Sequence, residues 1–173
     1  MRMPGPAIQD FYDDRAAACY GCGRLNEAGL RLRTWWAPDD SAQTETRFVP
    51  RPEHTAMPGY VYGGLVASVL DCSGTGSASL AATRERGRDP RADGAVRFVT
   101  GTLEVRFCAP TPLGPELVVR GRIAEVKGRK VTVELTMTAD AEIVATGRVI
   151  ALEAPDAMRA AERTPEPGPP SVE

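Results

Sequence analysis

The sequence predicts an α+β fold in which one long central helix is wrapped by a mostly antiparallel sheet of about six strands. Three observations predict this fold. Residues 62–84 form one long run that is apolar or small on most sides, which is typical of a buried helix. Two segments before this run and four after it have the residue pattern of strands. The last three of these strands are joined by tight turns, which indicates antiparallel pairing.

A helix that is buried on most sides needs cover, and the concave face of a twisted sheet supplies it. This arrangement is the hotdog fold. The 173 residues are enough for one such domain with a sizeable core. Glycines and serines within the helix lower its propensity, but they allow another backbone to approach closely.

The elements follow in a simple order. Residues 1–18 are expected to be a lead-in with a short helix over residues 9–18, and a glycine-rich loop follows. The six strands are expected at residues 30–36, 42–49, 95–109, 116–126, 130–139 and 142–152. The last twenty residues are rich in proline and charge, which predicts disorder. We therefore divide the chain into the lead-in, a hotdog domain at residues 19–153 and a tail at residues 154–173.

Composition and cysteine usage narrow the possible partners and cofactors. A formal net charge of -2, with both signs interspersed, gives no general attraction to nucleic acids or anionic membranes, so neither is an expected partner. Because no secretory signal or apolar membrane span is recognisable, we expect a cytoplasmic protein with reduced thiols. Cys19 and Cys22 have the C-x₂-C spacing of a metal site, but no second Cys or His pair follows at ligand spacing. We therefore expect no metal, and we expect Cys72 to be a small core residue.

A single formal charge interrupts the neutral stretch between His54 and Arg84, the carboxylate of Asp71. The helix that carries it begins near Gly63 and Gly64, which have no side chains to shield the free N–H groups of the first turn. These groups form the positive end of the helix dipole and could stabilise an oxyanion. Asp71 could attack an acyl carbon or deprotonate a water that does so. The alternative is a structural carboxylate on a helix whose start needs a flexible backbone.

The stretch HTAMPGYVYGGLVASVLD resembles the signature of the hotdog-fold acyl-CoA thioesterases of the phenylacetate-degradation (PaaI-like) type. That family has a His-Gly-Gly followed by an Asp eight residues after the first Gly, the spacing of Gly63 and Asp71 here. The segments CYGCGRLNEAGLRLR and TGTLEVRFCAPTPLG resemble the adjoining parts of the family, so the resemblance covers residues 19–152. The chain departs from the family at Tyr62, where the family has His, and at Ala56, where Asn or Gln is common.

The resemblance implies hydrolysis of an acyl-CoA or acyl-carrier thioester without a cofactor, with coenzyme A present only as part of the substrate. It implies that Asp71 is the nucleophile or general base and that the Gly63 N–H is the oxyanion donor. It also implies that Thr100, at the start of the strand after the helix, orients the water. It further implies that Gly64 and Tyr62 lie beside the thioester, although Tyr62 could equally serve in packing.

Three further residues are candidate substrate contacts. His54, the only histidine, lies in a loop and would be either structural or a contact to the substrate. Arg129 and Lys130, in the hairpin KGRK, could meet the phosphates of coenzyme A, although basic hairpin tips also serve solubility. Arg84 and Arg86 are alternatives for the same role.

The spacing of the two catalytic candidates predicts a dimer. Gly63 and Asp71 are eight residues apart, which is about 12 Å along a helix. To contact the oxygen and the carbon of one carbonyl, they would have to lie within about 6 Å of each other. One chain cannot satisfy both contacts. We therefore expect an obligate homodimer, with tetramers also open, in which Gly63 of one subunit faces Asp71 of the other.

Two other functions stay open at this stage. One is a hotdog protein that binds an acyl or aromatic ligand without hydrolysing it. The other is a hydratase or dehydratase acting on acyl thioesters. Such enzymes usually rely on a catalytic histidine, and the tyrosine at position 62 argues against that class. Because the histidine is absent at position 62, a protein that binds its ligand without hydrolysing it also stays an alternative.

Overall fold

The computed structural model describes residues 5–155 and residue 158 of the chain. It contains one long helix, α1 (Gly63–Glu85), and a single helical turn, α2 (Pro90–Asp93). The strands are β1 (Thr34–Trp36), β2 (Gln43–Phe48), β3 (Thr55–Met57), β4 (Tyr60–Val61), β5 (Phe98–Phe107), β6 (Leu117–Lys127), β7 (Lys130–Ala139) and β8 (Glu142–Glu153). The helix and five of the six main strands lie close to their predicted positions, and β1 is shorter than predicted.

Six strands form one antiparallel sheet in the order β1-β2-β6-β7-β8-β5. The predicted α+β hotdog fold is therefore confirmed. Strands β3 and β4 form a separate two-stranded ribbon in the segment before α1. In the main sheet, β5 is an edge strand, so one side of its backbone has no strand partner among the described residues.

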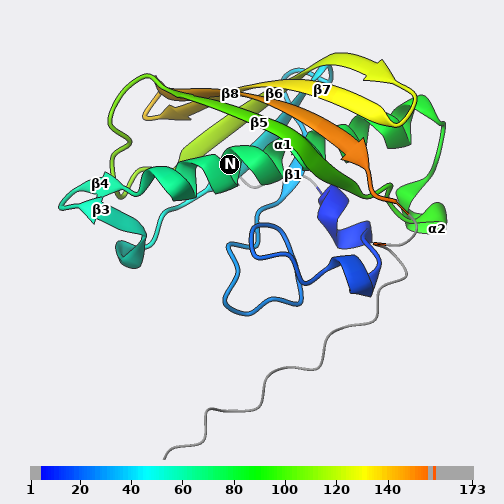
Figure 1. Ribbon diagram of the computed structural model, residues 1–173, viewed down its shortest axis with the longest axis horizontal. Coiled ribbons are helices and arrows are strands. Elements are labelled where there is room, and N and C mark those ends of the chain that lie inside the picture. The colour runs from blue at the N-terminus through cyan, green and yellow to red at the C-terminus, as the bar shows by residue number, and fades with distance from the viewer. Residues whose placement is uncertain (1–4, 156–157, 159–173) are drawn as a thin grey trace, which may run out of the picture.

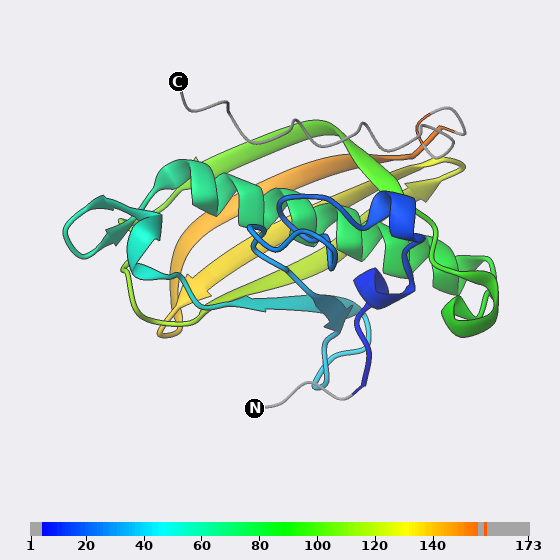
Figure 2. The ribbon, with the colours of Figure 1, turned by 90° about the horizontal axis from the view of Figure 1, so that it is seen from below.

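Helix α1 lies across the concave face of the sheet, and the N-terminal segment covers the opposite side of the helix (Figures 1 and 2). Apolar residues from all three layers share one core, for example Ile8 and Tyr12 of the lead-in, Val69 of the helix and Val133 of the sheet. The lead-in thus helps to bury the side of the helix that the sheet does not cover.

Glycine at position 74 brings α1 close to the sheet. A Cβ atom on Gly74 would lie only 2.5 Å from Val149 Cγ2, well inside van der Waals contact. In an exposed helix, Gly→Ala stabilises by about 1 kcal/mol. Here we expect Gly74→Ala to lower the free energy of unfolding by about 1–3 kcal/mol, because the methyl group overpacks the interface.

Urea denaturation of Gly74→Ala measures this effect, and Ala67→Gly on the same helix is the matched control. That control should lower stability by about 0.5–1 kcal/mol through propensity alone. A stabilising Gly74→Ala would contradict the close packing of the helix against Val149.

The predicted lead-in helix is wrong. Residues 9–18 instead contribute to two short 3₁₀-helices, η1 (Ile8–Phe11) and η2 (Asp14–Ala16). Tyr12 is extended between them, and the side chain of Asp13 caps the second helix by accepting a backbone hydrogen bond. This local capping competes with a continuous helix.

The first predicted strand is correct only in its second half. The amides of Leu30 and Leu32 donate to the carbonyls of Tyr20 and Gly21, at 2.8 and 2.9 Å. Leu30 and Leu32 therefore fasten the preceding cysteine-containing loop instead of joining the sheet.

The predicted boundary at residue 154 falls where the described chain nearly ends. Ala154 is buried, and its amide donates to the carbonyl of Arg97 at 2.8 Å. Most of the tail predicted to be disordered, residues 154–173, lies outside the described residues.

Candidate active site

Asp71 meets Thr100 at the edge of the sheet. Asp71 is half-buried on α1, and its Oδ1 accepts a hydrogen bond from Oγ1 of Thr100, an exposed residue of β5. Burial raises the pKa of Asp71 above its ordinary value, and the Thr100 hydrogen bond partly opposes this effect. The structure therefore brings together two of the residues predicted to be catalytic, and it does so beside the open edge of β5.

The start of α1 presents free backbone donors. Tyr62 is the N-cap residue, and its carbonyl accepts hydrogen bonds from the amides of Leu65 and Val66 at 3.0 and 3.3 Å. Among the described residues, no backbone carbonyl accepts from the amide of Gly63 or Gly64. These two groups are thus available to an oxyanion at the positive end of the helix dipole.

The two parts of the predicted site are separated within one chain. Because α1 is continuous from Gly63 to Glu85, Gly63 and Asp71 lie about 12 Å apart along its axis. Gly63 lies beside Phe107, where an added Cβ would be 3.4 Å from the ring, whereas Asp71 lies beside Thr100. The two candidates therefore occupy opposite ends of β5.

Two hollows flank the N-terminus of α1. The larger, of about 600 Å³, has mainly apolar side chains, including those of Met57, Val66 and Phe107. The smaller, of about 370 Å³, is lined by residues that include His54, Tyr62 and Gly64. Both hollows border the free amides, so either could receive part of a ligand held there.

The predicted substrate contacts of the second hollow differ in exposure. The side chain of Tyr62 is exposed and lies over Gly64, where an added Cβ would be 2.3 Å from the ring. His54 is buried, its Nδ1 accepts from the amide of Arg51 at 3.0 Å, and its ring lies 5.6 Å from that of Phe48. Burial lowers the pKa of His54, which favours the neutral ring.

The basic candidates lie in the β6–β7 hairpin, near the Asp71 end of the sheet. Lys130 pairs with Leu152 across β7 and β8, and Val99, next to Thr100, pairs with the same Leu152. Arg129 is exposed, and Lys130 Nζ is 3.7 Å from Glu125 Oε2. Arg129 Nη2 also donates to the carbonyl of Glu153 at 3.4 Å.

The alternative basic residues are engaged within the chain. Arg84 lies 3.3 Å above the ring of Trp36 and donates to the carbonyl of Ser41. Arg86 forms a 2.7 Å ion pair with Glu153. Contact with a phosphate would cost these arginines their present partners.

Comparison with known proteins identifies the family of the chain. Residues 58–149, more than half of the chain, match the family model of the thioesterase superfamily. The chain belongs to the thioesterase superfamily. The matched region of this superfamily member includes Tyr62, Gly63, Asp71 and Thr100. A comparison with curated proteins found no match.

Three solved structures illustrate the relationship. A thioesterase superfamily protein from Shewanella loihica PV-4 is 44% identical, with a TM-score of 0.58, over 72% of this chain and 91% of that one. A phenylacetic acid degradation-related protein from Ralstonia eutropha JMP134 is 21% identical, with a TM-score of 0.57, over 71% and 85% of the two chains. The E. coli PaaI protein is 12% identical, with a TM-score of 0.54, over 67% and 75%. The last two show a shared fold only.

A cluster of three thiols beside Asp71 was not predicted from the sequence. Cys19, Cys22 and Cys72 place their sulfur atoms within 4.8 Å of one another, although residues 19 and 72 are far apart in sequence. The thiols of Cys22 and Cys72, supported by backbone amides, lower the pKa of Cys19 far below its ordinary value, while the pKa of Cys72 is raised. The C-x₂-C motif was the available signal, but the third member is contributed by the helix.

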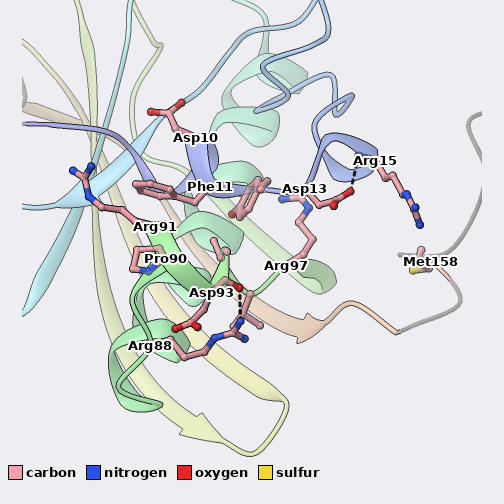
Figure 3. Close-up of a pocket in the computed structure, with 14 residues that line it drawn as sticks. Asp10, Phe11, Asp13, Arg15, Arg88, Pro90, Arg91, Asp93, Arg97 and Met158 are labelled. Carbon is pink, nitrogen blue, oxygen red and sulfur yellow. Dashed lines mark hydrogen bonds between the residues drawn. The ribbon is translucent and has the colours of Figure 1, made fainter.

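A further cavity of this thioesterase-superfamily chain lies away from both catalytic candidates. It measures about 590 Å³ and lies between the lead-in and the α2–β5 segment (Figure 3). Its charged lining is mixed, with four arginines and three aspartates: Arg15, Arg88, Arg91, Arg97, Asp10, Asp13 and Asp93. Neither Gly63 nor Asp71 lines it, so the catalytic proposal does not use it. No described helix has the length and apolarity needed to cross a membrane.

Proposed function

We propose that the protein hydrolyses acyl-CoA or acyl-carrier thioesters at a site shared between two subunits. The observation that carries this proposal is the hydrogen bond between Asp71 and Thr100 at an exposed sheet edge, with Asp71 on the same helix as the free amides of Gly63 and Gly64. A carboxylate of one subunit, brought near the preorganised amide donors of another, would match the requirements of acyl transfer. Membership of the thioesterase superfamily supports the same class of reaction.

The open edge of β5 suggests how the site is completed. If two β5 strands pair antiparallel about a two-fold axis near their middle, each end of one strand lies beside the opposite end of the other. The Thr100 end carries Asp71 and the Phe107 end carries Gly63. Such a dimer would therefore place the Gly63 amide of one subunit near Asp71 of its partner, which the 12 Å separation prevents within one chain.

Exposed apolar side chains support an interface in this region. Met57, Tyr60 and Phe107 have relative exposures of 67%, 44% and 55%, and they cluster near the start of α1. A partner that pairs with β5 would cover part of this surface, together with unpaired backbone groups of the edge.

In the proposed reaction, the Gly63 amide donates to the carbonyl oxygen of the thioester as negative charge develops there. Thr100 holds Oδ1 of Asp71, which leaves Oδ2 to accept a proton from the attacking water. The C–S bond then breaks, the thiolate leaves and takes up a proton, and a carboxylic acid forms. Direct attack by Asp71 is the other route, through an anhydride with the acyl group that water then hydrolyses.

The surroundings suggest how the substrate is oriented. The apolar hollow beside Gly63 suits the acyl group, and the exposed Arg129 and the half-buried Lys130 suit the phosphates of coenzyme A. Tyr62 and Gly64 border the thioester position, and the buried His54 would support that wall of the site.

A panel of acyl-CoA thioesters with a free-thiol readout tests this function. We expect catalysed thiol release with at least one short, long or aromatic acyl group, at a rate that rises in proportion to enzyme concentration. A binding protein is the alternative, because Tyr62 stands where the family signature that this sequence resembles has a histidine. Tight binding of the same thioesters without thiol release, measured by calorimetry, would favour that alternative and contradict hydrolysis.

A further inference from the structure

We propose that Cys19, Cys22 and Cys72 form a binding site for Zn²⁺, which would fasten the N-terminal loop to helix α1 beside Asp71. Cys19 and Cys22 come from the loop, and Cys72 directly follows Asp71 on the helix. The site is separate from the groups assigned to thioester hydrolysis. It therefore stands whether or not the protein is a hydrolase.

The spacing of the sulfur atoms suits a metal ion. All three lie within 4.8 Å of one another, and those of Cys19 and Cys72 are 4.0 Å apart. The centre of a triangle with 4.8 Å sides is about 2.8 Å from each corner, whereas a Zn–S bond measures about 2.3 Å. An inward shift of about 0.5 Å per sulfur would therefore bring all three into bonding distance.

The loop is built to hold two of the sulfurs against the third. The C-x₂-C spacing is common among zinc ligands, and the amide of Gly23 donates to the Cys19 carbonyl at 2.8 Å to close the turn. A Cβ on Gly21 would lie 2.2 Å from the Cys72 sulfur, so only glycine allows the loop to approach this closely. The loop backbone thus brings its two cysteines onto the helix.

The charge around the cluster also suits three thiolates and a divalent cation. Three thiolates and one Zn²⁺ leave about one net negative charge. Arg97 places Nη1 3.7 Å from the sulfur of Cys22, so its guanidinium balances that charge and donates to a ligand sulfur. A fourth coordination position stays open for water, and the half-buried Cys19 is the most accessible of the three ligands.

A disulfide is the competing chemistry for this cluster. A disulfide would join only two of the sulfurs and leave the third as a thiol. It would not explain why all three sulfur atoms lie within 4.8 Å of one another. Coordination uses all three, and it needs the reduced thiols that the sequence predicts.

Metal analysis of the untagged full chain tests the proposal. The reduced protein is incubated with Zn²⁺, desalted and measured by inductively coupled plasma mass spectrometry. We expect about one zinc per chain in the wild type and almost none in Cys19→Ser or Cys72→Ser. The matched control Cys108→Ser, at an exposed cysteine outside the cluster, should keep the full amount.

Cobalt substitution and melting temperature give independent readouts. Co²⁺ should produce an intense thiolate-to-metal charge-transfer band in the wild type, and this band should disappear in Cys19→Ser. Zn²⁺ should raise the melting temperature of the wild type but not that of Cys19→Ser, which replaces the half-buried ligand and is expected to fold. If the fully reduced chain takes up no zinc, or if Cys19→Ser binds as much as the wild type, the proposal is wrong.

Discussion

Asp71→Asn is expected to lower kcat for thioester hydrolysis by about 10²–10⁴-fold, the usual contribution of a general acid or base. Asparagine has nearly the same shape and can still accept the Thr100 hydrogen bond at Oδ1. It cannot accept a proton from water at neutral pH or attack an acyl carbon as a carboxylate does. The loss should therefore appear in kcat, with a smaller change in KM.

The control for this experiment is Asp140→Asn, on the turn between β7 and β8. Asp140 is exposed and has a positive φ of 48°, a conformation that asparagine also adopts readily. This variant should keep wild-type activity, and gel filtration should show the same assembly for both variants. If Asp71→Asn retained wild-type kcat, Asp71 would be neither base nor nucleophile.

The fold was largely predictable because its main signals are local. The helix was predicted at residues 62–84 and occurs at Gly63–Glu85, since a long neutral segment ends at charged residues. The β6–β7–β8 meander was predictable because short turns join strands of suitable length. Leu30 and Leu32 show the limit of this approach, since their alternation matched a strand while their amides bond to the N-terminal loop.

Family spacing allowed candidate site residues to be named from the sequence, whereas contacts between distant segments could not be predicted. The resemblance pointed to Asp71 and to Thr100 as separate candidates, and the structure adds the hydrogen bond between their side chains. The meeting of Cys72 with Cys19 and Cys22 did not follow, because no local pattern shows which face of a helix a distant loop will cover. From the sequence alone, Cys72 was therefore predicted to be an ordinary core residue, and the C-x₂-C motif of Cys19 and Cys22 lacked the further ligand needed to predict a metal.

Gly63→Pro is expected to lower kcat by about 10²–10³-fold, because proline removes the backbone N–H proposed as the oxyanion donor. Gly63 is the first residue of α1, where proline is well tolerated. Tyr62 has φ -62° and ψ 129°, which are suitable values for a residue before proline. Gly63→Ala is the matched control, because it keeps the amide and its Cβ would lie 3.4 Å from Phe107, an ordinary contact.

Mixing the two inactive variants tests whether the site is shared. If Gly63 of one subunit serves Asp71 of the other, a hybrid of Asp71→Asn and Gly63→Pro has one site with both changes and one unchanged site. After random exchange at equal amounts, half of the dimers are hybrids, so about a quarter of the sites should be wild-type. Activity should therefore recover to about a quarter of the wild-type value. If both groups came from one chain, every site in the hybrid would carry one of the changes. The mixture would then be no more active than its components, and the shared site would be excluded.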